Sequence, residues 1–271
     1  MKVFLSDRRT IAFFQQKATP DFWDAHWETG NLKAQISSCR SDSYFVPAVQ
    51  QTLPLNSLVL EGGCGKGLIV HALNYQGYQA IGLDFAASTV SRVKKAVPNL
   101  NMITGDVFSL PLRDQSIDGY ISGGVIEHFS DGCLPILQEM SRVIRENGYL
   151  YISFPYMSPL RRVKGFMRMY PVRDSDYLER RKNEFYQFAL RHDVVIGELE
   201  KLGFSLQEIS AFDGIKGFKD EVAWARPFLQ KVYDGKVLTG KFTRHIRGYL
   251  DSVFKLFAAH CIFLVFQKKT V

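Results

Sequence analysis

An alternation of short apolar runs with amphipathic stretches between residues 55 and 155 constrains the fold of this chain most strongly. The stretches between the runs repeat apolar residues at helical spacing, and the runs have the length of strands. We expect strands at 58–60, 80–83, 100–104, 119–121 and 149–154, and two more at 204–212 and 261–266. Strands that alternate with helices pair in parallel through right-handed crossovers, so the pattern predicts an open sheet covered on both faces.

The predicted domain organisation follows from where this rhythm holds and where it breaks. Residues 55–271 are expected to form one domain, with a basic, lid-like insertion at about 156–190 and a basic connection at about 214–258. Residues 1–54 are expected to form a helical extension over the site, in which Trp23 and Trp27 lie one helical turn apart. The structural alternative for these two tryptophans is plain packing onto the core.

Charge and cysteine usage narrow the class of protein. The net charge is +7, yet residues 156–192 and 216–271 carry nine and eleven Lys/Arg against four Asp/Glu each, which leaves the rest of the chain at −5. Such segments suit an anionic substrate, a membrane surface or nucleic acid, and the structural alternative is a solvated basic face. The four cysteines form no C-x-x-C pair, so we expect no metal site and a cytoplasmic location. Neither a signal peptide nor a membrane span is expected, because charges interrupt the first residues and the longest apolar run, 256–266, is too short.

The segment from Val59 to Gly67 carries the most specific pattern, because an acidic residue at a strand end is followed by glycines at alternate positions. Glycines allow a tight bend and a close approach of a ligand to the backbone. The G-x-G-x-x-G pattern of dinucleotide-binding proteins is missing, since Leu68 stands where its third glycine belongs. A nucleoside triphosphate loop is also excluded, because Gly67 follows Lys66 in place of Ser or Thr.

The sequence Glu61-Gly62-Gly63-Cys64-Gly65-Lys66-Gly67 resembles the cofactor loop of class I S-adenosylmethionine-dependent methyltransferases, similar to the quinone-biosynthesis-like branch. Later segments match the same family in order, including Gly105-Asp106-Val107 and Val125-Ile126-Glu127-His128. The resemblance implies an α/β fold: a doubly wound, seven-stranded Rossmann-like sheet, mostly parallel with an antiparallel last strand, and helices on both faces. Ile117 stands where the family more often has Phe, which is a mild departure.

The resemblance also implies S-adenosyl-L-methionine as cofactor and a set of residues that bind it. Asp84 would accept hydrogen bonds from both ribose hydroxyls while Phe85 packs on the adenine, and Asp106 with the Val107 N–H would bind the adenine edge. Ser122 and Gly123 would approach the methionine end of the cofactor. The remaining predicted cofactor-binding residues are Glu61, Gly62, Gly63, Cys64 and Gly65. Cys64 is read as a packing residue and not as a nucleophile.

No catalytic base is assigned from the sequence. His128 is a weak candidate because it follows the fourth strand at the carboxyl edge of the sheet, but a structural role is the favoured interpretation. Methyl transfer from a sulfonium depends mainly on alignment and exclusion of water, so a sparse catalytic signature is expected.

The acceptor stays open at this level. The leading expectation is an enzyme that methylates a small-molecule or lipid-like acceptor, anionic or amphipathic in character, with peripheral membrane contact compatible with the basic insertion. The alternatives are a methyltransferase acting on RNA or protein, and a non-catalytic subunit that keeps the fold. A nucleic-acid partner is not expected, because the chain lacks the Asn-Pro-Pro-Tyr and Pro-Cys sequences found in some relatives that methylate bases.

Overall fold

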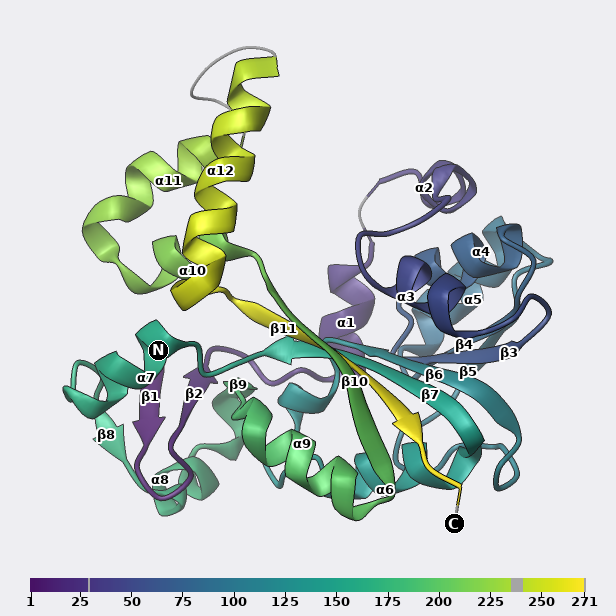
Figure 1. The fold of residues 1–271 in the computed structure, drawn as a ribbon, viewed down its shortest axis with the longest axis horizontal. Helices are drawn as coiled ribbons and strands as arrows, with labels where there is room; N and C mark the ends of the chain where they lie inside the picture. The colour runs from purple at the N-terminus through teal and green to yellow at the C-terminus, as the bar shows by residue number, and fades with distance from the viewer. Residues whose placement is uncertain (29, 235–240, 271) are drawn as a thin grey trace.

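A seven-stranded twisted sheet organises the molecule in the computed structural model, which describes residues 1–28, 30–234 and 241–270 (Figure 1). The strand order is β10-β11-β7-β6-β3-β4-β5. β11 runs antiparallel to its neighbours β7 and β10, whereas the pairs β3–β4, β4–β5, β3–β6 and β6–β7 are parallel. The strands are β3 (Leu58–Gly62), β4 (Gln79–Asp84), β5 (Met102–Thr104), β6 (Ile117–Gly123), β7 (Ile144–Pro155), β10 (Phe204–Phe212) and β11 (Cys261–Lys268). The predicted fold class is thereby confirmed.

Alternate residues of the strands point to opposite faces of the sheet, and each face is covered by its own helices. Leu60 and Ile152 belong to a core cluster with α6 (Leu134–Val143) and α9 (His192–Lys201). Their neighbours Val59 and Tyr151 belong to a second cluster on the other face. The helices of that second cluster are α3 (Phe45–Thr52), α4 (Leu68–Tyr75) and α5 (Ala87–Ala96).

One boundary within the sheet differs from the prediction. The apolar spacing from Leu134 to Ile144 predicts a helix that ends near Gly148. This helix, α6, ends at Val143, and β7 begins at Ile144, before its predicted start at Tyr149. Ile144 pairs with Ile117 of β6 across a register shift, so pairing with the neighbouring strand extends β7 toward its N-terminus.

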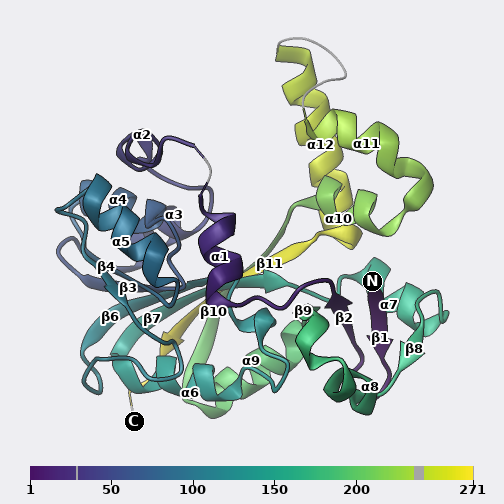
Figure 2. The same cartoon turned by 180° about the vertical axis from the view of Figure 1, so that it is seen from behind.

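The N-terminal extension, expected to be helical over residues 1–54, begins instead with a β-hairpin. β1 (Lys2–Leu5) and β2 (Thr10–Phe14) pair antiparallel and lie at the centre of a second, four-stranded sheet of order β8-β1-β2-β9. The outer strands, β8 (Val172–Arg173) and β9 (Phe185–Ala189), come from the basic insertion. The helical prediction was wrong here because the partners of the hairpin lie far along the chain. The insertion and the N-terminus therefore form one unit (Figures 1 and 2).

Helices complete the additions to the sheet. The N-terminal extension continues as α1 (Pro20–His26) and α2 (Leu32–Ser38), and the insertion contains α7 (Pro159–Phe166) and α8 (Ser175–Arg180). The basic connection forms an arm that projects away from the sheet (Figure 1). It comprises α10 (Gly214–Glu221), α11 (Arg226–Tyr233) and α12 (Lys241–Ala258), and its residues 235–240 lie outside the described ranges. In those ranges, no helix has both the length and the apolar character needed to cross a membrane.

A buried carboxylate, Glu221 of α10, ties the additions together. It accepts hydrogen bonds from Lys2 Nζ (2.8 Å), Arg161 Nε (3.1 Å), Lys164 Nζ (3.0 Å) and Tyr170 Oη (2.6 Å). Burial alone would raise the pKa of Glu221, but Arg161 and Lys2 outweigh this effect and lower its pKa to about 2. The hairpin, the insertion and the arm thus share one ion-pair cluster.

Replacing Glu221 by Gln is expected to destabilise the protein by about 3 kcal/mol, because Arg161 is fully buried and would lose its anionic partner. Urea unfolding of Glu221→Gln measures this effect. The matched control is Glu208→Gln on β10, an exposed carboxylate expected to change stability by less than about 0.5 kcal/mol. Equal stabilities of the two variants would show that the cluster does not hold the additions.

Candidate functional site

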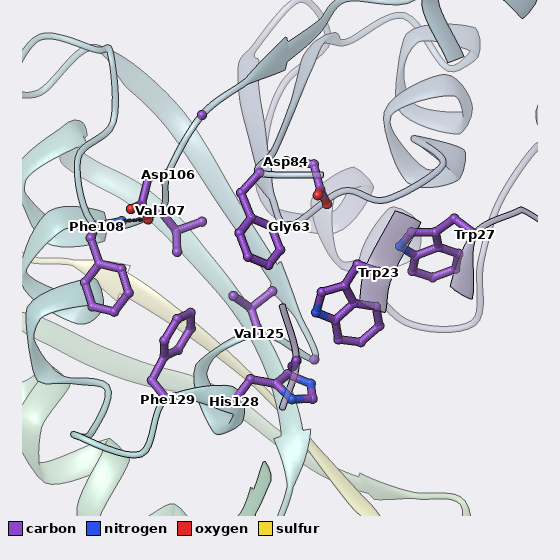
Figure 3. A pocket seen from close by; sticks show the side chains of 15 residues that line it. Trp23, Trp27, Gly63, Asp84, Asp106, Val107, Phe108, Val125, His128 and Phe129 are labelled. Carbon is purple, nitrogen blue, oxygen red and sulfur yellow. Dashed lines mark hydrogen bonds between the residues drawn. The ribbon is translucent and has the colours of Figure 1, made fainter. Parts of the chain in front are cut away.

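The strand order reverses at β3, and this reversal opens a crevice at the carboxyl edge of the sheet. The chain proceeds from β3 through β4 to β5 on one side and then returns to β6 on the other side of β3. At such a reversal the loops after two neighbouring strands run in opposite directions and leave a crevice between them. Open α/β sheets bind ligands in this crevice. A cavity of about 370 Å³ lies there (Figure 3). Its lining comprises Ala18, Trp23, Trp27, Gly63, Asp84, Phe85, Gly105, Asp106, Val107, Phe108, Gly123, Gly124, Val125, His128 and Phe129.

The bend between β3 and α4 leaves no space for side chains. Gly63 and Gly65 have φ of +77° and +50°, in the left-handed region that favours glycine. A Cβ on Gly63 would lie 2.5 Å from Val125 Cγ2, and one on Gly65 would lie 2.8 Å from Trp27 Cε2. Only glycine fits at these positions, so the backbone of the bend borders the cavity directly.

Asp84, at the end of β4, fixes the bend and borders the cavity. Its Oδ2 accepts the N–H of Gly65 (2.8 Å) and its Oδ1 accepts the N–H of Ala86 (2.9 Å). Burial raises the pKa of Asp84, although these backbone hydrogen bonds act against the shift. Each carboxylate oxygen can accept a second hydrogen bond, so Asp84 retains acceptors for a ligand.

The loop after β5 supplies a second carboxylate and part of an aromatic wall. Asp106 Oδ1 accepts the N–H of Phe108 (3.0 Å), and Asp106 is exposed. Phe108 packs edge to face on Phe129, with ring centroids 4.7 Å apart. In Figure 3 the two carboxylates lie at the upper edge of the cavity and His128 at its lower edge, with Val125 between them.

Five of the predicted cofactor-binding residues do not line this cavity: Glu61, Gly62, Cys64, Gly65 and Ser122. Gly62 lies against Tyr120, whose hydroxyl would be 1.9 Å from a Cβ there. Cys64 is buried with its Sγ 3.8 Å from Met102 Sδ. Burial raises the pKa of Cys64 well above its usual value, which fits packing and not nucleophilic chemistry.

Glu61 and Ser122 stand at the ends of the two strands that flank the crevice, and both are buried. Glu61 Oε2 and Ser122 Oγ have no hydrogen-bond partner among the described residues. Burial, followed by the nearby carboxylates of Asp42 and Asp84, raises the pKa of Glu61 well above its usual value. Buried polar atoms without a partner are costly, so these two atoms indicate that a ligand is expected nearby.

Helix α1 closes one side of the cavity with an aromatic pair. Trp23 and Trp27 stack with centroids 6.0 Å apart and an interplanar angle of 20°. Asp24 holds the helix on α5, because its Oδ1 accepts from the N–H (2.7 Å) and the hydroxyl (2.6 Å) of Thr89. The helical spacing of the two tryptophans was visible in the sequence. Phe108 and Phe129 gave no sequence signal, and Val125 was noted only as the first residue of the segment 125–128 and not as a cavity residue.

His128 lies at the lower end of the cavity, in the short 3₁₀ helix Ile126–His128. Its Nδ1 is 2.8 Å from the carbonyl oxygen of Tyr186. Because a carbonyl only accepts hydrogen bonds, Nδ1 carries a proton, and in the neutral ring Nε2 keeps its lone pair. Burial lowers the pKa of His128, which favours this neutral form. The ring therefore has the state required of a proton acceptor.

The neighbouring Glu127 is a second buried titratable group. Its side chain is almost fully buried, and its Oε1 is 3.9 Å from His128 Nε2. Burial raises the pKa of Glu127 from 4.5 to about 8, although Lys216 acts against the shift. Glu127 is therefore mainly protonated at neutral pH.

This pKa predicts a specific pH dependence of stability. Between pH 4.5 and about pH 8 the folded chain keeps the proton on Glu127, whereas the unfolded chain has already released it. The free energy of unfolding of the wild type therefore falls as the pH rises across this window. Each unit of pKa difference corresponds to about 1.4 kcal/mol, so the loss reaches several kcal/mol. Glu127→Gln cannot titrate, and urea unfolding from pH 5 to 9 should show it gaining on wild type as pH rises. A pH-independent difference would contradict the assignment.

Comparisons with known proteins bear on this geometry. A family model described as "Methyltransferase domain" matches residues 60–152. A probable S-adenosylmethionine-dependent methyltransferase of Mycolicibacterium smegmatis is 35% identical over 97 residues, which are 36% of this chain and 37% of that protein. A probable tRNA methyltransferase 9B of Mus musculus is 35% identical over 98 residues, 35% of this chain and 21% of that protein.

A solved structure shares the fold of this chain. A structure of a SAM-dependent methyltransferase from Methanosarcina mazei superposes with a TM-score of 0.55 at 15% identity, and the match covers 84% of this chain and all (100%) of that one. At this identity the likeness shows the fold alone. The chain spans little more than a third of the length of the Mycolicibacterium relative. Residues 60–152 therefore match the methyltransferase domain model, and the chain shares its fold with the Methanosarcina SAM-dependent methyltransferase structure.

Proposed function

We propose that this protein transfers a methyl group from S-adenosylmethionine to a small-molecule or lipid-like acceptor. The observation that carries the proposal is the cavity at the strand-order reversal, where a side-chain-free bend meets two carboxylates and an aromatic wall. When bound, S-adenosylmethionine supplies a methyl group on a sulfonium, which is an excellent leaving group. The chain's own residues then have to bind, align and exclude water.

The two carboxylates suit the nucleoside part of the cofactor. Asp84 keeps lone pairs for the two ribose hydroxyls, and Asp106 can accept from the amino group of adenine. Phe85 is 40% exposed and Phe108 is 39% exposed, so their rings are accessible for stacking on a base. The backbone at Gly63 and Gly123 remains for the amino-acid end, near the unpartnered atoms of Glu61 and Ser122.

The described residues explain catalysis by alignment, with one candidate for proton transfer. Trp23 and Trp27 cover the cavity and keep water from the reacting atoms. For a hydroxyl acceptor, His128 Nε2 is the group at this end of the cavity that can take a proton. For an amine or carboxylate acceptor no base is required.

The alternative acceptor is RNA, which is the substrate class in the name of the mouse relative. Basic side chains do line a cavity of about 730 Å³, among them Arg9, Arg162, Arg168 and Arg191. That cavity shares no lining residue with the crevice. Because the basic cavity and the crevice share no lining residue, the structure favours a small acceptor over a nucleic acid bound across both cavities.

The RNA alternative makes its own prediction. A basic groove that binds RNA loses affinity steeply as salt rises, because phosphate contacts release counterions. We expect filter binding of a structured tRNA to be weak at 150 mM salt and to show no transfer of labelled methyl groups. Tight, salt-dependent binding together with methylation would replace the small-molecule proposal.

Cofactor binding is tested by two substitutions in the crevice. Gly63→Ala places a Cβ 2.5 Å from Val125 in a left-handed backbone conformation, and Asp84→Asn removes a charged acceptor. Calorimetric titration with S-adenosylmethionine should show a loss of affinity of about 10- to 100-fold for each, as expected for a lost charged hydrogen bond.

Matched controls separate binding from folding. Gly197→Ala on α9 meets no atom within 4 Å, and Asp176→Asn changes an exposed carboxylate on α8. Both should bind the cofactor as wild type does. Wild-type affinity in the Gly63 and Asp84 variants would refute the proposed binding mode. Wild type that binds S-adenosylmethionine but never forms S-adenosylhomocysteine with any acceptor would support a non-catalytic subunit instead.

A further inference from the structure

A second, larger cavity adjoins the crevice at Gly124 and His128, which line both. Its volume is about 850 Å³. Its walls come from the end of β7, the start of β11, the N-terminal hairpin, β9 and α10. The core sheet supplies one wall and the additions supply the others, so this second cavity depends on segments outside the matched residues 60–152.

Two cations in the second cavity form no ion pair with a carboxylate among the described residues, although Lys216 interacts electrostatically with Asp213 and Glu127. Lys216 of α10 makes no hydrogen bond or ion pair with any residue that the structure describes. Arg226 donates to backbone carbonyl oxygens, of Lys219 (3.3 Å) and Asp220 (3.5 Å). The other lysine of the lining, Lys2, forms an ion pair with Glu221 at 2.8 Å.

The acidic and titratable groups of the lining do not balance these cations. The carboxylate of Asp220 lies 3.5 Å from Lys219 Nζ and 3.9 Å from His260 Nδ1, so it is already engaged. Burial raises the pKa of Cys261 to about 12 and lowers the pKa of His260, so both are uncharged at neutral pH. Glu127, whose buried Oε2 lacks a partner, is mainly protonated. The second cavity therefore carries net positive charge.

We infer that the second cavity holds the methyl acceptor and selects one with an acidic group, whose anion pairs with Lys216 and Arg226 while its nucleophilic atom lies at Gly124 and His128. This inference rests on the proposed function, because it places the methyl donor in the adjoining crevice. The half-buried ammonium of Lys216 is stabilised more by an anion than by water. An acidic ligand is therefore bound at the α10 wall of the second cavity.

The reaction that this arrangement supports is balanced. The bond between sulfur and methyl breaks, sulfur keeps the electron pair, and the acceptor atom forms the new bond to carbon. A hydroxyl or amine acceptor releases its proton to His128 Nε2 or to solvent. A carboxylate acceptor has no proton to lose. Since that carboxylate is the group methylated, the acceptor would need a second acidic group to pair with Lys216.

The test uses pairs of probes that differ only in charge, titrated into the full chain saturated with S-adenosylhomocysteine. The probes are benzoate with benzamide and octanoate with octanamide, followed by ligand-observed NMR. Wild type should bind at least one carboxylate about tenfold more tightly than its amide. Lys216→Met should reduce this preference below about twofold, and Lys216→Arg should retain most of it.

The control is Lys231→Met, which removes an exposed lysine of α11 and should keep the wild-type preference. Binding of S-adenosylhomocysteine is measured in the same samples. If it binds and neither carboxylate is preferred, or if Lys216→Met keeps the preference, the inference is wrong while the proposed function stands. If S-adenosylhomocysteine does not bind to wild type, the proposed function itself fails.

Discussion

The carboxylate of Asp84 joins the two strand ends from which the site is built, and the rest of the crevice depends on this contact. It accepts the N–H groups of Gly65 and Ala86, so the bend after β3 is fixed relative to the start of α5. The bend can lie so close to Val125 and Trp27 because it carries no side chains at Gly63 and Gly65. The same carboxylate that shapes the bend is therefore also available to a ligand, which couples the architecture of the sheet to binding.

The wall that α10 contributes to the second cavity is held in place by ion pairs and not by strand pairing. Glu221 accepts hydrogen bonds from the hairpin and from the insertion, including α7, and it lies on the same helix as Lys216. A cluster that keeps Arg161 fully buried is sensitive to removal of one partner. The position of α10, and with it the positive charge of the second cavity, thus depends on residues outside the matched segment 60–152.

The sequence predicts the core well because the relevant signals are local. Buried parallel strands are read from apolar runs, and both 204–212 and the start at Cys261 agree with the structure. The glycine bend is visible because only glycine tolerates the conformations of Gly63 and Gly65. Local patterns do not reveal which neighbours a segment meets, so the β1–β2 hairpin, whose partners are β8 and β9, was assigned as helix.

The site shows the same limit. Asp84 and Asp106 follow their strands directly and were predicted to lie in the site, and both line the crevice. Cys64 and Gly62 stand on either side of Gly63, which lines the crevice, but they pack against Met102 and Tyr120. The second cavity could not be predicted, because segments from distant parts of the chain assemble it.

The most direct test of the account is a crystal structure of the chain with S-adenosylhomocysteine. The account predicts the ribose at Asp84, the adenine between Asp106 and the aromatic wall, and the thioether sulfur directed past Gly124 toward the second cavity. Density for the nucleoside outside the crevice, or a sulfur directed away from His128, would contradict it.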